Sequence, residues 1–232
     1  MPAPAPSPTD PTAAAPLVPD RMAPDRRASD PAPSAPALPP LAQQHARLLT
    51  LGLDVPPLPA DLSGDLLVVS ARHTPVADLV PLMRRGDRTG FVVEDLTDLA
   101  EFGPVEGVRV PHTDLYAVSA PERGDEYANL SPDEVDPVLR TRGRSPMTAA
   151  EGVAWVLQVP EVLERNRCFM TTGSRRAGSR PGRLEARVPA LWISNGTGRD
   201  GRERRGAPKL GWCWAGNRHT WLGIASVGGR GA

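Results

Sequence analysis

The chain has 232 residues and a mass of 24.7 kDa, and 40% of its residues are hydrophobic, which suffices for one large folded core. Its 27 basic residues equal its 27 acidic residues, so the net charge gives no argument for a nucleic-acid or membrane partner. No segment approaches the roughly 18 apolar residues of a membrane span, and two cysteines, Cys168 and Cys213, are too few for a disulfide framework.

The first 40 residues are dominated by Pro, Ala, Ser and Asp, and 16 of the 28 prolines lie in the first 60 positions. Such a composition buries too little apolar surface to offset the entropy lost on ordering, so residues 1–40 are predicted to be a disordered tail. The apolar run Ala13–Val18 is interrupted by Pro16, and no secretory signal is predicted. We therefore expect a cytoplasmic protein that does not attach to a membrane.

Residues 41–60 are predicted to form a short helix and a linker, because Leu41, Leu48 and Leu49 recur near helical spacing and Gly52 follows as a cap. Residues 61–232 are then expected to form one domain. Its first elements are strands at 66–70, 91–93 and 115–119 and a helix from Thr74 to about Arg85.

Two capping boxes predict the helices that follow. Ser131 precedes Glu134 by three residues, and Thr148 precedes Glu151 by three residues. In this arrangement the hydroxyl accepts from a free amide of the first turn while the Glu side chain reaches back to the cap. Pro160 is expected to end the second helix, and both carboxylates are interpreted as structural.

From Arg167 onward the hydrophobic period changes to two, which is typical of strands. The expected strands are 168–172, 188–194, 209–215 and 219–227. Helices and strands mix early while strands dominate late, so the predicted fold class is α+β, with a mainly antiparallel C-terminal sheet packed by helices.

Charge is balanced only in total. Residues 61–138 carry 6 basic and 16 acidic side chains, whereas residues 139–232 carry 17 basic and 6 acidic ones. Acidic and basic parts can pair within the fold or between copies of a homo-oligomer. The alternative is an exposed cationic face that binds an anionic ligand or a nucleic acid.

Four arginines, Arg199, Arg202, Arg204 and Arg205, are interleaved with glycines that satisfy the pattern of a dinucleotide-binding loop. That pattern requires a helix to follow, and a strand is expected here instead, so a dinucleotide site is not predicted. Two interpretations remain, an anion-binding loop and a solvated mobile loop. A second basic loop precedes the strand at 188–194 and carries Arg175, Arg176, Arg180, Arg183 and Arg187.

The segment 209–227 has an unusual concentration of aromatic residues. Gly216 and Asn217 are a typical hairpin pair, and a hairpin centred there would set Trp214 opposite His219 and Trp212 opposite Trp221. These four side chains would then share one sheet face. That face is either covered core or a platform for a planar ligand, to which Asn217 and Arg218 would add polar contacts.

Catalytic and metal chemistry find little support in the sequence. None of the four histidines has a second His or Cys at zinc-finger spacing, so no metal or other cofactor is predicted. Lys209, Asn217 and His219 remain as a possible pocket of a small enzyme. Cys213 is not expected to act as a nucleophile, because the hairpin would separate it from His219.

Several segments resemble an actinobacterial family catalogued as a domain of unknown function. The similar segments are RVPALWIS from Arg187, APKLGWCWAGNRHTWLG from Ala207, SPDE at Ser131 and CFMTTGSR at Cys168. This resemblance implies kinship over about residues 60–230 but no activity. The leading functional hypothesis is therefore a non-enzymatic binding module that uses its tryptophans and arginines for an anionic or planar ligand or a protein partner.

Overall fold

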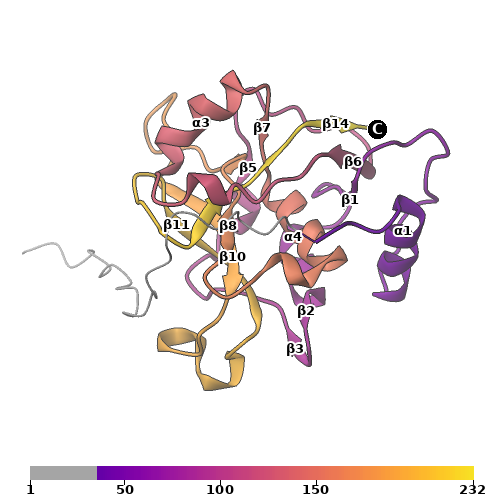
Figure 1. Cartoon of the computed structure of the whole chain (residues 1–232), viewed down its shortest axis with the longest axis horizontal. Coiled ribbons are helices and arrows are strands. Elements are labelled where there is room, and N and C mark those ends of the chain that lie inside the picture. The colour runs from indigo at the N-terminus through magenta and orange to yellow at the C-terminus, as the bar shows by residue number, and fades with distance from the viewer. Residues whose placement is uncertain (1–35) are drawn as a thin grey trace, which may run out of the picture. The chain divides into compact units, whose positions relative to one another are not determined.

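A computed structural model describes residues 36–232 (Figure 1), and most of the predicted tail lies outside these residues. The α+β prediction is confirmed. The α-helices of this part are α1 (Leu41–Thr50), α2 (Val76–Leu79), α3 (Pro132–Thr141) and α4 (Ala149–Gln158). No helix within residues 36–232 is both long enough and apolar enough to span a bilayer.

Helix α1 belongs to the folded unit, although the sequence predicted only a helix and linker ahead of the domain. The amide of Gln44 donates to the carbonyl oxygens of Pro39 and Asp65, and its Oε1 accepts from the backbone N–H of Leu67. Arg47 Nε donates to the carbonyl oxygen of Leu157 at 2.6 Å. Because these bonds join α1 to distant segments, the folded unit begins before residue 41.

A three-stranded antiparallel sheet forms one part of the core. Its strands, in spatial order, are β1 (Leu66–Val69), β6 (Leu115–Ser119) and β14 (Gly229–Gly231). All four residues of β1 are buried, so both faces of this sheet are covered. The strands expected at 66–70 and 115–119 are thereby confirmed.

A five-stranded mixed sheet forms the other main part. In spatial order its strands are β12 (Leu222–Ile224), β8 (Cys168–Met170), β10 (Arg187–Ile193), β11 (Pro208–Trp214) and β4 (Phe91–Val92). The central strands β8, β10 and β11 pair antiparallel, as predicted, whereas the edge strands β12 and β4 pair parallel to their neighbours.

Helix α4 contacts strands of both sheets, β1 and β10 (Figure 1). The Thr148 hydroxyl accepts from the backbone N–H of Glu151, whose carboxylate accepts from the Thr148 N–H, so this capping box forms as predicted. Gly152 allows the close approach, since a Cβ there would lie 2.7 Å from the Leu191 side chain. We call the side of the five-stranded sheet that carries Leu191 the α4 face.

Helix α3 begins at the other predicted capping box, formed by Ser131 and Glu134. The remaining strands form three two-stranded ladders. These pair β2 (Arg84–Arg85) with β3 (Arg88–Thr89), β5 (Gly103–Pro104) with β9 (Ser174–Arg175), and β7 (Ser145–Pro146) with β13 (Ser226–Val227). Single 3-10 turns, η1 (Val80–Leu82), η2 (Leu99–Glu101), η3 (Asp125–Tyr127), η4 (Pro160–Val162), η5 (Gly198–Asp200) and η6 (Arg202–Arg204), connect these elements.

The helix expected from Thr74 to about Arg85 is wrong in its second half. Helix α2 covers only Val76–Leu79 and tightens into η1, where Pro81 can supply no N–H to continue the helix. The chain then forms the β2–β3 hairpin. Arg84 and Arg85, which the prediction placed at the end of a helix, therefore lie with Arg88 on one hairpin.

The hairpin predicted at Gly216 and Asn217 is also wrong. Strand β11 pairs with β10 and β4, while β12 pairs with β8 on the far side of β10. The pairings make β11 and β12 parallel, so residues 215–221 form a crossover that carries the chain back along the sheet. A local turn signal cannot reveal that the better partner of β11 lies elsewhere in the chain.

Candidate anion-binding site

The ladder between β10 and β11 has two ends with different chemistry. At one end Ile193 pairs with Pro208, and residues 194–207 connect the strands; at the other end Arg187 pairs with Trp214. Seven paired residues on each strand separate the ends by about 20 Å. We call the first the loop end and the second the tryptophan end. The two basic loops therefore lie at opposite ends, and their charges do not add.

At the tryptophan end, Trp212 and Trp214 meet edge to face with their ring centroids 4.7 Å apart. Trp214 is 40% exposed. The guanidinium of Arg187 lies over two aromatic rings, 5.4 Å from the centroid of Phe102 and 5.7 Å from that of Trp212. Both tryptophans are on the α4 face, because Leu210, two residues earlier, pairs with Leu191.

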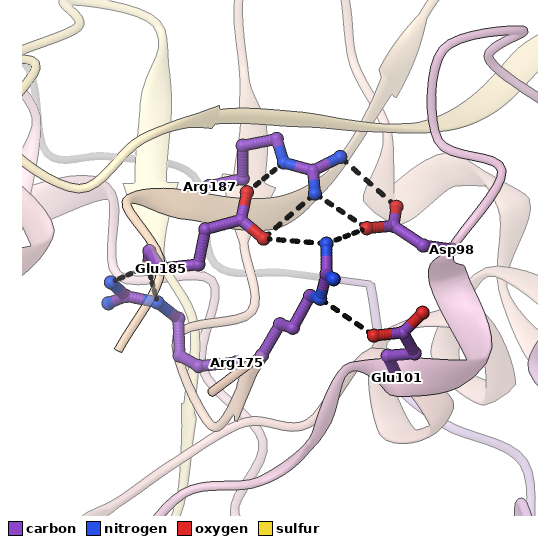
Figure 2. Close-up of polar contacts among 6 residues, drawn as sticks. Asp98, Glu101, Arg175, Glu185 and Arg187 are labelled. Carbon is purple, nitrogen blue, oxygen red and sulfur yellow. Dashed lines mark hydrogen bonds and ion pairs between the residues drawn. The ribbon is translucent and has the colours of Figure 1, made fainter. Parts of the chain in front are cut away.

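Two of the five arginines of the second basic loop, Arg176 and Arg187, are paired with carboxylates (Figure 2). Arg187 donates to both carboxylate oxygens of Asp98, at 3.1 and 2.6 Å, and is also paired with Glu185. Arg176 contacts Asp98 at 2.6 Å and Glu101 at 2.7 Å. Three acidic side chains thus face the arginines of this loop. For these residues the explanation that charges pair within the fold is confirmed.

The same contacts shift the pKa values of this cluster. Hydrogen bonds from Arg187 lower the pKa of Asp98 and of Glu185, and donating these bonds to the two carboxylates raises the pKa of Arg187. Arg175 donates to the backbone carbonyl of Glu185 at 3.2 Å through Nε, and its burial lowers its pKa. The charges of this cluster are therefore already paired with one another, which leaves little attraction for an added anion.

At the loop end, a buried clamp closes residues 194–207. Asp200 Oδ2 accepts from Lys209 Nζ at 2.5 Å and from Ser194 Oγ at 2.7 Å. The side chains of Lys209 and Asp200 are each 10% exposed. As predicted, no helix follows the glycines of this loop; the 3-10 turns η5 and η6 stand in its place.

The arginines of this loop point outward. Arg199, Arg202 and Arg205 are exposed, and Arg204 is half-buried with its guanidinium 4.6 Å from the centroid of Phe91. Arg199 has a partial partner in Asp95 at 3.5 Å. Neither Arg202 nor Arg205 forms an ion pair with any carboxylate of residues 36–232.

The β2–β3 hairpin brings further arginines to the same place. Arg88 Nη1 donates to the carbonyl oxygen of Glu203 in η6 at 2.8 Å. In Figure 1 the hairpin and the loop after β10 both extend toward the bottom of the view. Arg84, Arg85 and Arg88 are all exposed. Sequence reasoning missed these three arginines because it placed Arg84 and Arg85 at the end of a helix and assigned Arg88 to no element.

A surface hollow of about 580 Å³ adjoins the hairpin. It is lined by Arg84, Arg85 and Gly86 on one side and by residues 160, 161 and 163–165 on the other. Arg165 in this lining is exposed. Glu164, also in the lining, is engaged by Arg123 Nη1 at 3.0 Å. The lining of the hollow therefore includes three arginines and two carboxylates. Of the two carboxylates, Glu161 forms no ion pair within residues 36–232.

Three segments thus contribute eight arginines to one end of the five-stranded sheet. We call this group the cationic end. Its members are Arg84, Arg85, Arg88, Arg165, Arg199, Arg202, Arg204 and Arg205.

The predicted face of three tryptophans and a histidine does not exist. Trp221 contacts Trp192, with centroids 6.3 Å apart, and His219, with centroids 5.7 Å apart. Trp192 pairs with Lys209, so its side chain lies on the face opposite to the α4 face, away from Trp212 and Trp214. The correct strand pairing splits the aromatic residues between the two faces.

The residues of the alternative enzyme pocket are not joined by hydrogen bonds. Lys209 Nζ is bonded to Asp200 and lies 4.7 Å from the centroid of Trp192. His219 Nε2 is buried without a partner in the described part of the chain, and burial lowers the pKa of this imidazole. Asn217 is exposed on the crossover.

Arg218, predicted to assist ligand binding, instead pairs with Glu134 at the start of α3. Hydrogen bonds from the Ser131 backbone and from Arg218 lower the pKa of Glu134 to about 2. Among residues 36–232, no group of three or more His, Cys, Asp or Glu side chains is arranged to hold a metal ion.

Comparison with protein families agrees with the sequence motifs. Residues 37–232 match a family described as "Family of unknown function (DUF5701)". The chain belongs to this family. The DUF5701 match begins just ahead of α1 and includes every element described above, so the family unit contains α1 as well as both sheets. Searches of curated proteins and of solved structures found no match.

Proposed function

We propose that this protein is a non-enzymatic binding module that holds a polyanionic ligand at its cationic end. The observation that carries the proposal is the set of eight arginines from three separate segments, of which only Arg88 and Arg199 contact a carboxylate of residues 36–232. Guanidinium groups bind phosphates through paired N–H donors, and exposed arginines lose little hydration energy when an anion arrives.

The rigidity of the loop supports this proposal over the alternative of a mobile solvated loop. Lys209, Asp200 and Ser194 hold the base of the loop, and Arg88 ties η6 to the β2–β3 hairpin. A site whose donors are already ordered loses less conformational entropy on binding. The arrangement thus favours specific capture of an anion over diffuse attraction.

The contrast between the two basic loops also supports the cationic end as the site. Arg176 and Arg187 at the tryptophan end are bonded to acidic side chains, whereas Arg202 and Arg205 at the loop end are bonded to none within the described part of the chain. An incoming phosphate would have to displace internal ion pairs in order to bind Arg176 or Arg187. At the loop end it could bind Arg202 and Arg205 without displacing an ion pair formed within residues 36–232.

We further propose that the module works in the cytosol of an actinobacterium. Cys168 and Cys213 are both free, which fits a reducing compartment. The chain contains 26 arginines and a single lysine, a preference that suits a GC-rich genome.

Isothermal titration calorimetry with inorganic polyphosphate tests the proposal. We expect binding at low salt that weakens steeply as salt is added, because the contacts are between exposed charges. The double variant R202Q/R205Q should bind about 2- to 30-fold more weakly, since each exposed ion pair contributes about 0.2–1 kcal/mol.

The matched control is R180Q/R183Q, which removes the same charge from two exposed arginines of the other loop. This variant should bind polyphosphate like the wild type. Equal losses in the two double variants would indicate that net charge alone attracts the ligand. That result, or no binding at low salt, would overturn the proposal.

A further inference from the structure

We infer that the polyanion is a single-stranded nucleic acid whose unpaired bases stack on the aromatic residues beside the cationic end. This inference rests on the proposed function. The first observation that supports it is a row of side chains across three neighbouring strands. Trp192 of β10 pairs with Lys209 of β11, which pairs with Phe91 of β4, so all three side chains lie on the same face.

The row is joined to the arginine loop by direct contacts. Arg204 lies over the ring of Phe91, and Asp200 of the same loop binds Lys209. Trp221 adds a second indole, in edge contact with Trp192. Aromatic rings and phosphate-binding arginines therefore adjoin one another, which is the combination that single-strand binding proteins use.

Trp192 retains accessible surface. Its indole and that of Trp221 are half-buried, as is Phe91. Lys209, which is itself buried, covers one side of the Trp192 ring. The remaining accessible surface of Trp192 is where we expect a base to make contact. Each base stacked on an aromatic side chain strengthens binding without requiring a particular sequence.

The shape of the cationic end favours a single strand over a duplex. Its arginines are on a hairpin whose strands have two residues each, on 3-10 turns and on loop segments. None of these is an α-helix that could enter a major groove, and the two-residue strands of the β2–β3 hairpin are much shorter than the ribbons that also read this groove. In a duplex, moreover, the flat faces of the bases are occupied by their neighbours and cannot stack on Trp192.

The first experiment uses the wild-type protein and three labelled probes of equal length: oligothymidylate, the corresponding abasic strand, and a duplex. Fluorescence anisotropy measures the affinity of each at the same salt concentration. The abasic strand keeps the phosphates and lacks the bases. We expect oligothymidylate to bind about 5- to 100-fold more tightly than the abasic strand, and more tightly than the duplex.

The second experiment compares W192L with W214L. Trp214 is an exposed indole on the other face and at the other end of the sheet, so it is a matched control. W192L should remove most of the advantage of oligothymidylate while leaving the abasic strand unaffected, and W214L should change neither. Near-UV circular dichroism checks the fold of each variant, and W221L replaces W192L if the latter does not fold.

The outcomes separate this inference from the proposed function. Equal affinities for oligothymidylate and the abasic strand, tighter binding of the duplex, or equal losses in W192L and W214L would overturn the inference and leave the proposed function intact. No binding of any strand and none of polyphosphate would overturn both. A base-dependent advantage that W192L alone abolishes would support both.

Discussion

The buried clamp at the loop end leads to a prediction that connects stability with binding. Replacing Asp200 by Ala leaves Lys209 Nζ without its carboxylate, in a position where the lysine side chain is only 10% exposed. Removing one partner of a buried ion pair costs about 3–5 kcal/mol. In a domain of this size each kcal/mol lowers the melting temperature by about 2–4 °C, so D200A should melt about 6–20 °C lower.

The double variant D200A/K209M isolates the interaction. It removes both charges, and replacing a buried pair by apolar groups is often neutral or stabilising. We therefore expect D200A/K209M to recover most of the melting temperature that D200A loses. Differential scanning calorimetry gives both values. Equal destabilisation of the two variants, or no effect of D200A, would refute the view that this pair closes the loop.

The same variants also test ligand binding, because the ordering of the loop and the net charge predict opposite changes in the affinity for polyphosphate. D200A makes the protein more positive by one charge, which by itself should strengthen polyphosphate binding. If the clamp orders the arginines, D200A should instead bind more weakly, and trypsin should cleave faster after Arg199, Arg202 or Arg205. Stronger binding by D200A would show that loop order contributes nothing.

The remaining predictions concern other parts of the fold. R230M should lower the free energy of unfolding, measured in urea, by about 3–5 kcal/mol, because it leaves the fully buried Glu151 carboxylate without its ion pair. A smaller decrease would contradict this role of the Glu151–Arg230 pair. Hydrogen bonding to Arg187 lowers the pKa of Asp98 from 3.8. The stability that this carboxylate contributes is therefore present above pH 3.8 and is lost as the pH falls through its folded pKa. R187M should flatten this acid dependence of the melting temperature, and an unchanged pH profile would argue against the Asp98–Arg187 pair. Desolvation of the half-buried Cys213 thiol raises its pKa to about 12. Iodoacetamide should therefore label this thiol slowly in the folded protein and rapidly in urea, and fast labelling of the native state would contradict this desolvation.

The parts of the fold that the sequence predicted are those determined by local chemistry. Ser131 with Glu134 and Thr148 with Glu151 start α3 and α4 as expected, because a capping box is complete within four residues. The arginines of residues 199–205 were recognised from the sequence as one basic loop; Arg199, Arg202 and Arg205 are exposed in the structure, whereas Arg204 is half-buried. Each of these features depends on neighbours in the sequence alone.

The errors arose where distant segments decide the structure. Gly216 and Asn217 are a strong hairpin signal, yet β11 gains seven paired residues by lying beside β10, and residues 215–221 become a crossover. Pro81 ends a helix that the cap at Thr74 and Pro75 favoured, so the arginines of the β2–β3 hairpin went unnoticed as part of the site. Trp192 was overlooked because its neighbour Trp221 comes from the crossover.

Nuclear magnetic resonance gives the most direct test of the cationic end as the binding site. Titration of the isotope-labelled protein with polyphosphate at low salt should shift the amide resonances of residues 84–89 and 195–206. Resonances of residues 176–186 and of Trp214 should stay in place. Shifts that concentrate at the tryptophan end, or spectra that do not change at all, would contradict the central claim.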